Sequence, residues 1–146
     1  MNCPICGYEA EVKRTPHTFR FGDVIELSYS CSKCDFKFSD IVSTIKHQED
    51  HEFYINAPEK LNTRIVKSKN CIIEIPELGI KVKPGDDKQG YVISVDKLID
   101  KIKTLLETRN APEKEYAISK LNAVKTGDFA ITVSLHDQDK NSIISI

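Results

Sequence analysis

Short segments in which apolar and polar residues alternate run through most of the chain and predict β-strands. The alternation, or a dense run of β-branched residues, is found at residues 24–30, 52–56, 70–75, 78–82, 91–93, 129–135 and 142–146. Pro76 ends one of these runs, because proline has no N–H to donate to a ladder. Strands separated by turns at short intervals are typical of a barrel or of a roll made of two sheets.

The apolar period changes in residues 95–106, where it predicts a helix that begins after an N-cap at Ser94. Pro112 suits the first turn of a second helix, and residues 117–124 carry a second apolar stripe at helical spacing. Together these features predict a helical hairpin at about 95–126. Because strand patterns lie on both sides of it, we expect the hairpin to be inserted in a β-rich domain and to pack against its sheet.

Composition limits the classes of protein that fit. The chain has 146 residues, of which 40% are hydrophobic and 29% charged, and a net charge of −1. That length suits one ordinary domain, or a small metal module followed by a domain of about 100 residues. A nearly balanced charge does not favour nucleic-acid binding through bulk electrostatics. No apolar run approaches the roughly 18 residues of a membrane span, and the start MNCPIC lacks the features of a secretory signal.

Two Cys-x-x-Cys pairs give the chain its most specific chemistry. Cys3 and Cys6 form the first pair, and Cys31 and Cys34 form the second. Each pair presents two thiolates from one tight turn, and four thiolates make a closed tetrahedral zinc site. Two such turns joined by short strands predict a zinc ribbon with one structural Zn²⁺. Free thiolate ligands are expected in a reducing compartment, so we predict a cytoplasmic protein.

A second ligand set satisfies the spacing of a C2H2 finger. It would combine Cys31 and Cys34 with His47 and His51. This alternative leaves the first cysteine pair without a role, and acidic residues outnumber Lys46 in the segment that would become a recognition helix. The two histidines are otherwise interpreted as solvated residues of a strand or loop.

Outside the finger the sequence offers no catalytic cluster. Cys71 lies among strand-forming residues and is interpreted as part of the core, because free cysteine is among the most buried residue types. No group of histidines and carboxylates has the spacing of a metal or acid–base site. We therefore predict that the protein is not an enzyme; an enzyme with a pocket inside the β-roll remains an alternative.

The order of these features resembles the ZPR-type zinc-finger protein family. Cys3-Pro4-x-Cys6-Gly7 and Cys31-x-x-Cys34 match the family's finger. Residues 61–68 are similar to its stretch that ends in Arg-x-Val-x-Lys-Ser, and residues 73–78 to its Ile-x-Ile-Pro-Glu-Leu segment. Asn141-Ser142 matches the end of a late Asp-Asp-Pro-x-x-Asn-Ser turn, although the proline is missing here. The chain carries one copy of the module, which resembles the archaeal form.

The resemblance implies a fold and a function. The fold is mainly β with an α insertion: a four-cysteine zinc ribbon at residues 1–50, then a β-barrel or double-stranded β-helix-like domain at 51–146 that carries the helical hairpin. The function is that of a zinc-binding adaptor or chaperone that binds translation elongation factor one-alpha and assists its folding or handling. A nucleic-acid-binding zinc ribbon of the translation or transcription machinery is the alternative.

Polar residues within the matched segments are candidate contacts for a protein partner. They are Arg64, Lys67, Ser68, Glu77, Asp137 and Asn141. All of them except Arg64 also have a structural interpretation: Lys67 and Ser68 as residues that open the next strand, and Glu77 as a turn residue. Asp137 and Asn141 are expected to fix a turn through side-chain-to-backbone hydrogen bonds.

Overall fold

The structure is a computed structural model that describes residues 2–20, 22–43, 51–109, 112–138 and 142–145. Its described strands form three antiparallel sheets. The ribbon sheet has the order β1-β2-β3, the middle sheet β10-β5-β8, and the four-stranded sheet β4-β9-β6-β7. No helix among the described residues is long and apolar enough to cross a membrane.

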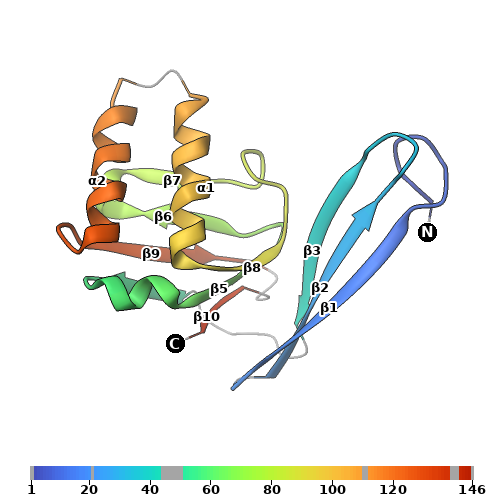
Figure 1. The fold of residues 1–146 in the computed structure, drawn as a ribbon, viewed down its shortest axis with the longest axis horizontal. Coiled ribbons are helices and arrows are strands. Elements are labelled where there is room, and N and C mark those ends of the chain that lie inside the picture. The colour runs from blue at the N-terminus through green and yellow to red at the C-terminus, as the bar shows by residue number, and fades with distance from the viewer. Residues whose placement is uncertain (1, 21, 44–50, 110–111, 139–141, 146) are drawn as a thin grey trace.

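The ribbon sheet consists of β1 (Glu11–Phe19), β2 (Gly22–Ser30) and β3 (Lys37–Ser43). Its long hairpins extend to one side of the rest of the molecule, and the N-terminus lies at their far end (Figure 1). At that end the sheet has a very small core, made of Cys3, Ala10 and Cys31 with Phe36 packed against them. So little apolar burial cannot hold the far end together by itself.

The remaining strands belong to the β-domain. The middle sheet contains β5 (Arg64–Lys67), β8 (Tyr91–Ser94) and β10 (Ile143–Ser145), and the four-stranded sheet contains β4 (His51–Ile55), β6 (Ile72–Ile75), β7 (Ile80–Val82) and β9 (Ile131–His136). Two short 3₁₀ helices, Pro58–Asn62 and Pro76–Leu78, connect them. The prediction of a mainly β fold is confirmed. The described strands form separate sheets and not a closed barrel, so the roll made of two sheets is the correct version of the prediction.

The predicted helical hairpin is also confirmed. Helix α1 spans Val95–Glu107 and begins where Ser94 Oγ accepts a hydrogen bond from the Lys97 N–H. Helix α2 spans Lys114–Thr126 and ends at Gly127, which has a φ of 84°. The two helices lie side by side (Figure 1) and bury their apolar faces in the same core as both sheets of the β-domain. Residues 110 and 111 lie outside the described residues.

The ribbon sheet and the β-domain meet through the middle sheet. Val66 and Ile143 lie on one face of this sheet, where they form a separate apolar cluster with Val24 and Ile41 of the ribbon. Ile65, the neighbour of Val66 in β5, belongs to the main core instead. The middle sheet is therefore covered on both faces, because successive side chains of a strand point to opposite sides.

Backbone contacts hold the same junction. The Gly90 N–H donates to Ser39 O at 2.7 Å, and Ser39 Oγ donates to Gly90 O at 2.7 Å. A Cβ on Gly90 would lie only 2.7 Å from the Cα of Asp40, so only glycine allows β3 to approach this closely. The predicted boundary between the two parts, at residue 50, falls in residues 44–50 and stays a prediction.

Candidate metal centre

The four predicted ligands come from two turns that are built alike. In the first, the Gly7 N–H donates to Cys3 O at 2.9 Å; in the second, the Asp35 N–H donates to Cys31 O at 3.0 Å. Both Gly7 and Asp35 adopt a positive φ, 79° and 60°, which turns the chain back towards its cysteine. Glycine does this without strain, and aspartate tolerates it better than most residues.

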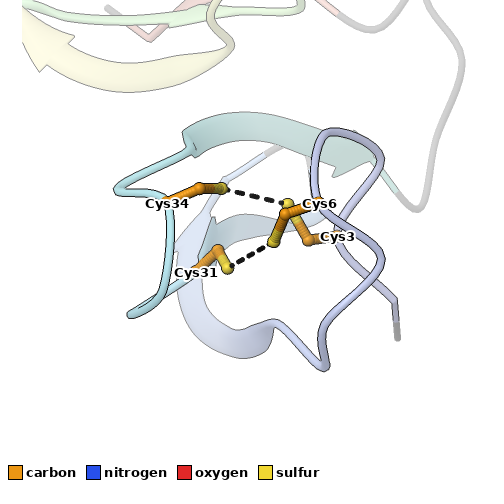
Figure 2. Close-up of side chains that lie close together, drawn as sticks. All are labelled: Cys3, Cys6, Cys31 and Cys34. Carbon is orange, nitrogen blue, oxygen red and sulfur yellow. Dashed lines mark hydrogen bonds between the residues drawn. The ribbon is translucent and has the colours of Figure 1, made fainter.

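The two turns bring four sulfur atoms together at the far end of the ribbon sheet (Figure 2). Cys3 Sγ lies 3.6 Å from Cys34 Sγ, and Cys6 Sγ lies 3.5 Å from Cys31 Sγ. All four atoms are within 4.8 Å of one another. Metal–sulfur bonds of about 2.3 Å in a tetrahedron place the sulfurs about 3.8 Å apart. The observed spacing therefore fits a single tetrahedral metal ion held by four thiolates.

The electrostatics of the cluster favour a cation. Backbone N–H groups of Cys34 and Lys33 donate to the sulfur of Cys31 and lower the pKa of that thiol to about 7. The backbone of Phe36 acts in the same direction on Cys34, but burial and the neighbouring sulfurs raise its pKa to about 12. Four sulfurs this close cannot all be ionised alone. A divalent cation removes that conflict, because it compensates the charge of every thiolate.

Within the described residues, these cysteines are the only group of three or more His, Cys, Asp or Glu side chains placed to hold a metal. The alternative ligand set is not assembled there: Cys31 and Cys34 face the first cysteine pair, and His51 begins β4 in the four-stranded sheet. His47 lies outside the described residues. Cys71 is fully buried in the main core, as predicted, and burial raises the pKa of its thiol to about 11.

Lys67, a predicted partner contact, is fully buried in the structure. Its ammonium group donates to the backbone carbonyls of Gln89 at 2.7 Å and of Ser68 and Asp87 at 3.2 Å. The carboxylate of Asp87 lies 4.0 Å away and accepts a hydrogen bond from the Tyr91 hydroxyl. These contacts attach residues 83–90, the loop between β7 and β8, to β5.

Ser68 and Asp137 also bond inside the protein. The Asp137 carboxylate accepts hydrogen bonds from Ser68 Oγ at 2.7 Å and from Ser142 Oγ at 2.8 Å, and all three residues are buried. The Ser68 N–H donates to Ser142 Oγ at 2.8 Å. This network ties the residue after β5 to the segment that enters β10. These two bonds of the Asp137 carboxylate come from side-chain hydroxyls, and not from the backbone N–H groups expected of a turn. Contact of Asp137 with a partner stays a prediction.

Two of the remaining candidates are exposed. Arg64 lies on the middle sheet, where its guanidinium is 2.9 Å from His17 Nδ1 and 5.1 Å from the ring centre of Phe19. Both partners belong to β1, so Arg64 links β5 to the ribbon sheet. Glu77 accepts hydrogen bonds from the N–H of Thr132 at 2.8 Å and from its hydroxyl at 2.7 Å. Asn141 lies outside the described residues. Partner contact by any of the three stays a prediction.

Sequence reasoning missed the residues that fix the ribbon to the β-domain. Gln89 Oε1 accepts hydrogen bonds from the Ser39 N–H and, at 3.1 Å, from the Ser39 hydroxyl. The one available signal was Gly90, a glycine directly before a strand, which is typical of a close backbone approach.

Comparison with known proteins places this architecture among its relatives. Residues 59–146 match the family model of the ZPR1 jelly-roll domain. An uncharacterized ZPR1-like protein of Methanocaldococcus jannaschii is 32% identical over 74% of this chain and 57% of its own length. A second, from Pyrococcus horikoshii, is 30% identical over 98% of this chain and 71% of its own. The zinc finger chaperone zpr1 of Schizosaccharomyces pombe is 26% identical over 86% of this chain, which spans only 30% of that protein.

Proposed function

Because this chain belongs to the ZPR1 family, we propose that it is a zinc-binding chaperone or adaptor whose client is translation elongation factor one-alpha. In this proposal the protein binds the factor and assists its folding or handling. The observation that carries the proposal is the four-sulfur cluster, in a chain whose S. pombe relative is named a zinc finger chaperone.

The metal has a structural role in this proposal. Four thiolates favour Zn²⁺ and leave no open position for water or substrate, so the ion holds the far end of the ribbon and performs no reaction. The ligands would be Cys3, Cys6, Cys31 and Cys34. We therefore propose a role in binding and not in catalysis, in the reducing cytoplasm where such thiolates persist.

Metal analysis tests the first half of the proposal. The purified protein is expected to contain one zinc per chain, and Co²⁺ substitution should give the visible absorption of a tetrahedral thiolate site. A His51→Ala variant should keep the full metal content, whereas Cys34→Ser should lose most of it. Because Cys34 belongs to both ligand sets, loss of the metal in His51→Ala as well would favour the C2H2 set instead.

Binding and refolding of the client test the second half. The zinc-loaded protein should capture purified elongation factor one-alpha in at least one of three states: bound to GDP, bound to GTP, or diluted from denaturant. It should also raise the yield of refolded factor that binds GTP, compared with an equal concentration of serum albumin. If the factor is captured in none of these states, the assignment of the client is wrong.

A further inference from the structure

A groove runs between the ribbon sheet and the β-domain, on the side where the 83–90 loop passes β3. Its volume is about 370 Å³, enough for one or two side chains of a ligand. The loop between β7 and β8 extends towards β3 in the same region (Figure 1). The groove is lined by Phe38, Lys69, Asn70, Pro84, Gly85 and Lys88.

The walls of this groove combine apolar surface with positive charge. Phe38 and Pro84 supply rings that are only partly covered, and Gly85 has open space where a side chain would be. Lys88 is exposed and forms no ion pair with any described residue. The Lys69 side chain is half exposed, and its ammonium lies 3.8 Å from Asp40 Oδ2. At that distance an exposed pair contributes little, so Lys69 keeps the capacity to bind another anion.

Asp40 and Asp86, which contact or adjoin lining residues of the groove, already have partners. Asp40 Oδ1 accepts a hydrogen bond from the Lys69 N–H at 3.1 Å, which holds its carboxylate against the chain. Asp86 follows Gly85, but it pairs with Arg109 at 2.7 Å and accepts a bond from the Lys83 N–H at 3.0 Å. A ligand would therefore meet two lysines that have a weak partner or none, beside one carboxylate, that of Asp86, which already has a close charged partner.

The two walls are held in place before any ligand binds. One of these walls belongs to β3 and the other to the 83–90 loop, while Lys69 and Asn70 line the groove from the segment after β5. Ser39 joins them through its bonds to Gln89 and Gly90, and buried Lys67 holds the loop by three carbonyls. Pre-organised walls reduce the entropy that binding would otherwise cost.

From this geometry we propose that the groove binds an acidic segment of a protein partner, with an apolar or aromatic side chain between carboxylates. The apolar side chain lies against Phe38 and Pro84, and the carboxylates pair with Lys69 and Lys88. The inference rests on the proposed function in that it requires a protein partner. Two lysines in a chain with a net charge of −1 are a poor footprint for nucleic acid, whose binding depends on many phosphate contacts.

The test uses NMR spectra of the zinc-loaded, ¹⁵N-labelled chain and three probes. The first is the capped peptide Glu-Glu-Phe-Glu-Glu, the second is its counterpart with lysine in place of glutamate, and the third is an eight-nucleotide single-stranded DNA. We expect only the acidic peptide to shift the amide signals of Phe38, Asn70 and Gly85. Added salt should weaken this binding, because the lysines are exposed.

Charge reversal assigns the effect to the groove. Lys69→Glu with Lys88→Glu should weaken the peptide at least about tenfold, since two attractive pairs become repulsive. The matched control reverses Lys13 and Lys97, which are exposed on β1 and α1, and should change the affinity less than about threefold. If the double variant does not fold, Lys88→Glu alone is used, because Lys88 makes no ion pair among the described residues.

Several results would overturn the proposal. Two of them are that the acidic peptide shifts no groove signal at millimolar concentration, and that it binds the reversed variant as well as the original. Equal shifts caused by the oligonucleotide would mark a nucleic-acid surface instead. Capture of elongation factor one-alpha separates failure of the groove proposal from failure of the proposed function. If the reversed variant captures the factor as well as the original protein does, the groove is not the binding site for this client, but the assignment of the client stands. If the original protein binds the peptide but does not capture the factor, the groove proposal stands and the assignment of the client is wrong.

Discussion

The ammonium group of Lys67 lies inside the protein, where an unpaired charge would cost several kcal/mol. Burial is the main influence on this group and lowers its pKa, while Asp87 raises it. Three backbone carbonyls accept hydrogen bonds from the ammonium group, so each of its N–H groups has a partner. A charged residue thus acts as an interior cross-link between β5 and the 83–90 loop.

Replacement of Lys67 by methionine should show what this cross-link contributes. The variant keeps most of the length of the side chain but removes the donor to three carbonyls and the positive charge beside the Asp87 carboxylate. We expect the free energy of unfolding to fall by about 3 kcal/mol, measured by urea denaturation followed by circular dichroism. Lys101→Met is the control: its ammonium lies 4.6 Å from the centre of the same Tyr91 ring but on the surface, and its loss should cost less than about 1 kcal/mol. Equal effects of the two changes would contradict the cross-link.

The hydrogen bonds of Glu77 predict that the free energy of unfolding depends on pH. Its slight burial raises the pKa of the carboxyl, but the two bonds from Thr132 outweigh burial and lower it below its ordinary value of about 4.3. The carboxylate therefore stabilises the fold above that value, and its contribution is lost as the pH falls through the lowered pKa. Glu77→Gln should cost about 0.5–1 kcal/mol at pH 7, since the group is exposed.

The difference in unfolding free energy between wild type and Glu77→Gln should shrink towards zero as the pH falls below about 4. Comparison of the two proteins at each pH cancels the effect of acid on the metal centre, which they share. A difference that stays constant down to pH 3 would show that the Thr132 bonds do not depend on the charge of Glu77.

At the scale of elements, the close approach of β3 to Gly90 is a sharp constraint. Gly90→Ala would place a Cβ 2.7 Å from Asp40 Cα and 3.0 Å from the Ile41 nitrogen, so one backbone must move. We expect a loss of about 2 kcal/mol in the free energy of unfolding and faster amide exchange in β3. Gly85→Ala lies in the same loop with nothing within 4 Å of the added atom, and it should be close to neutral.

The elements that local pattern determines are the ones that sequence analysis predicted. Ser94 and the apolar spacing after it place the start of α1 correctly, and the two Cys-x-x-Cys turns specify their own geometry. Local pattern could not predict the buried position of Lys67. Its three acceptors lie at positions 68, 87 and 89, and they come together only in the folded chain. For the same reason, the contact between β3 and the 83–90 loop has no signal in the sequence beyond Gly90.

At the scale of the whole molecule, the β-domain and the ribbon sheet differ in how much apolar core stabilises them. The β-domain has one large core drawn from both of its sheets and both helices, whereas the far end of the ribbon has Cys3, Ala10, Cys31 and Phe36. We expect a chelator to increase amide exchange in residues 2–43 by at least about tenfold, and to change the strands of the four-stranded sheet much less. Mass spectrometry of the exchanged peptides measures both.

Thiol labelling provides a check on that experiment. Chelation should make the four clustered cysteines reactive towards iodoacetamide at pH 8, because they lose their metal. Cys71 should stay unreactive until the β-domain unfolds, since it is fully buried and its pKa is raised to about 11. Labelling of Cys71 together with the other four would show that the metal supports the entire molecule.

The apolar cluster between ribbon and middle sheet has a consequence for the order of events during synthesis. Its members lie at positions 24, 41, 66 and 143, so the cluster cannot close before Ile143 has left the ribosome. The ribbon needs only residues near the N-terminus and is able to bind its metal much earlier. Between the synthesis of β3 and that of β10, the nascent chain therefore carries a ribbon whose Val24 and Ile41 are not yet fully covered, and Ile143 completes their cover.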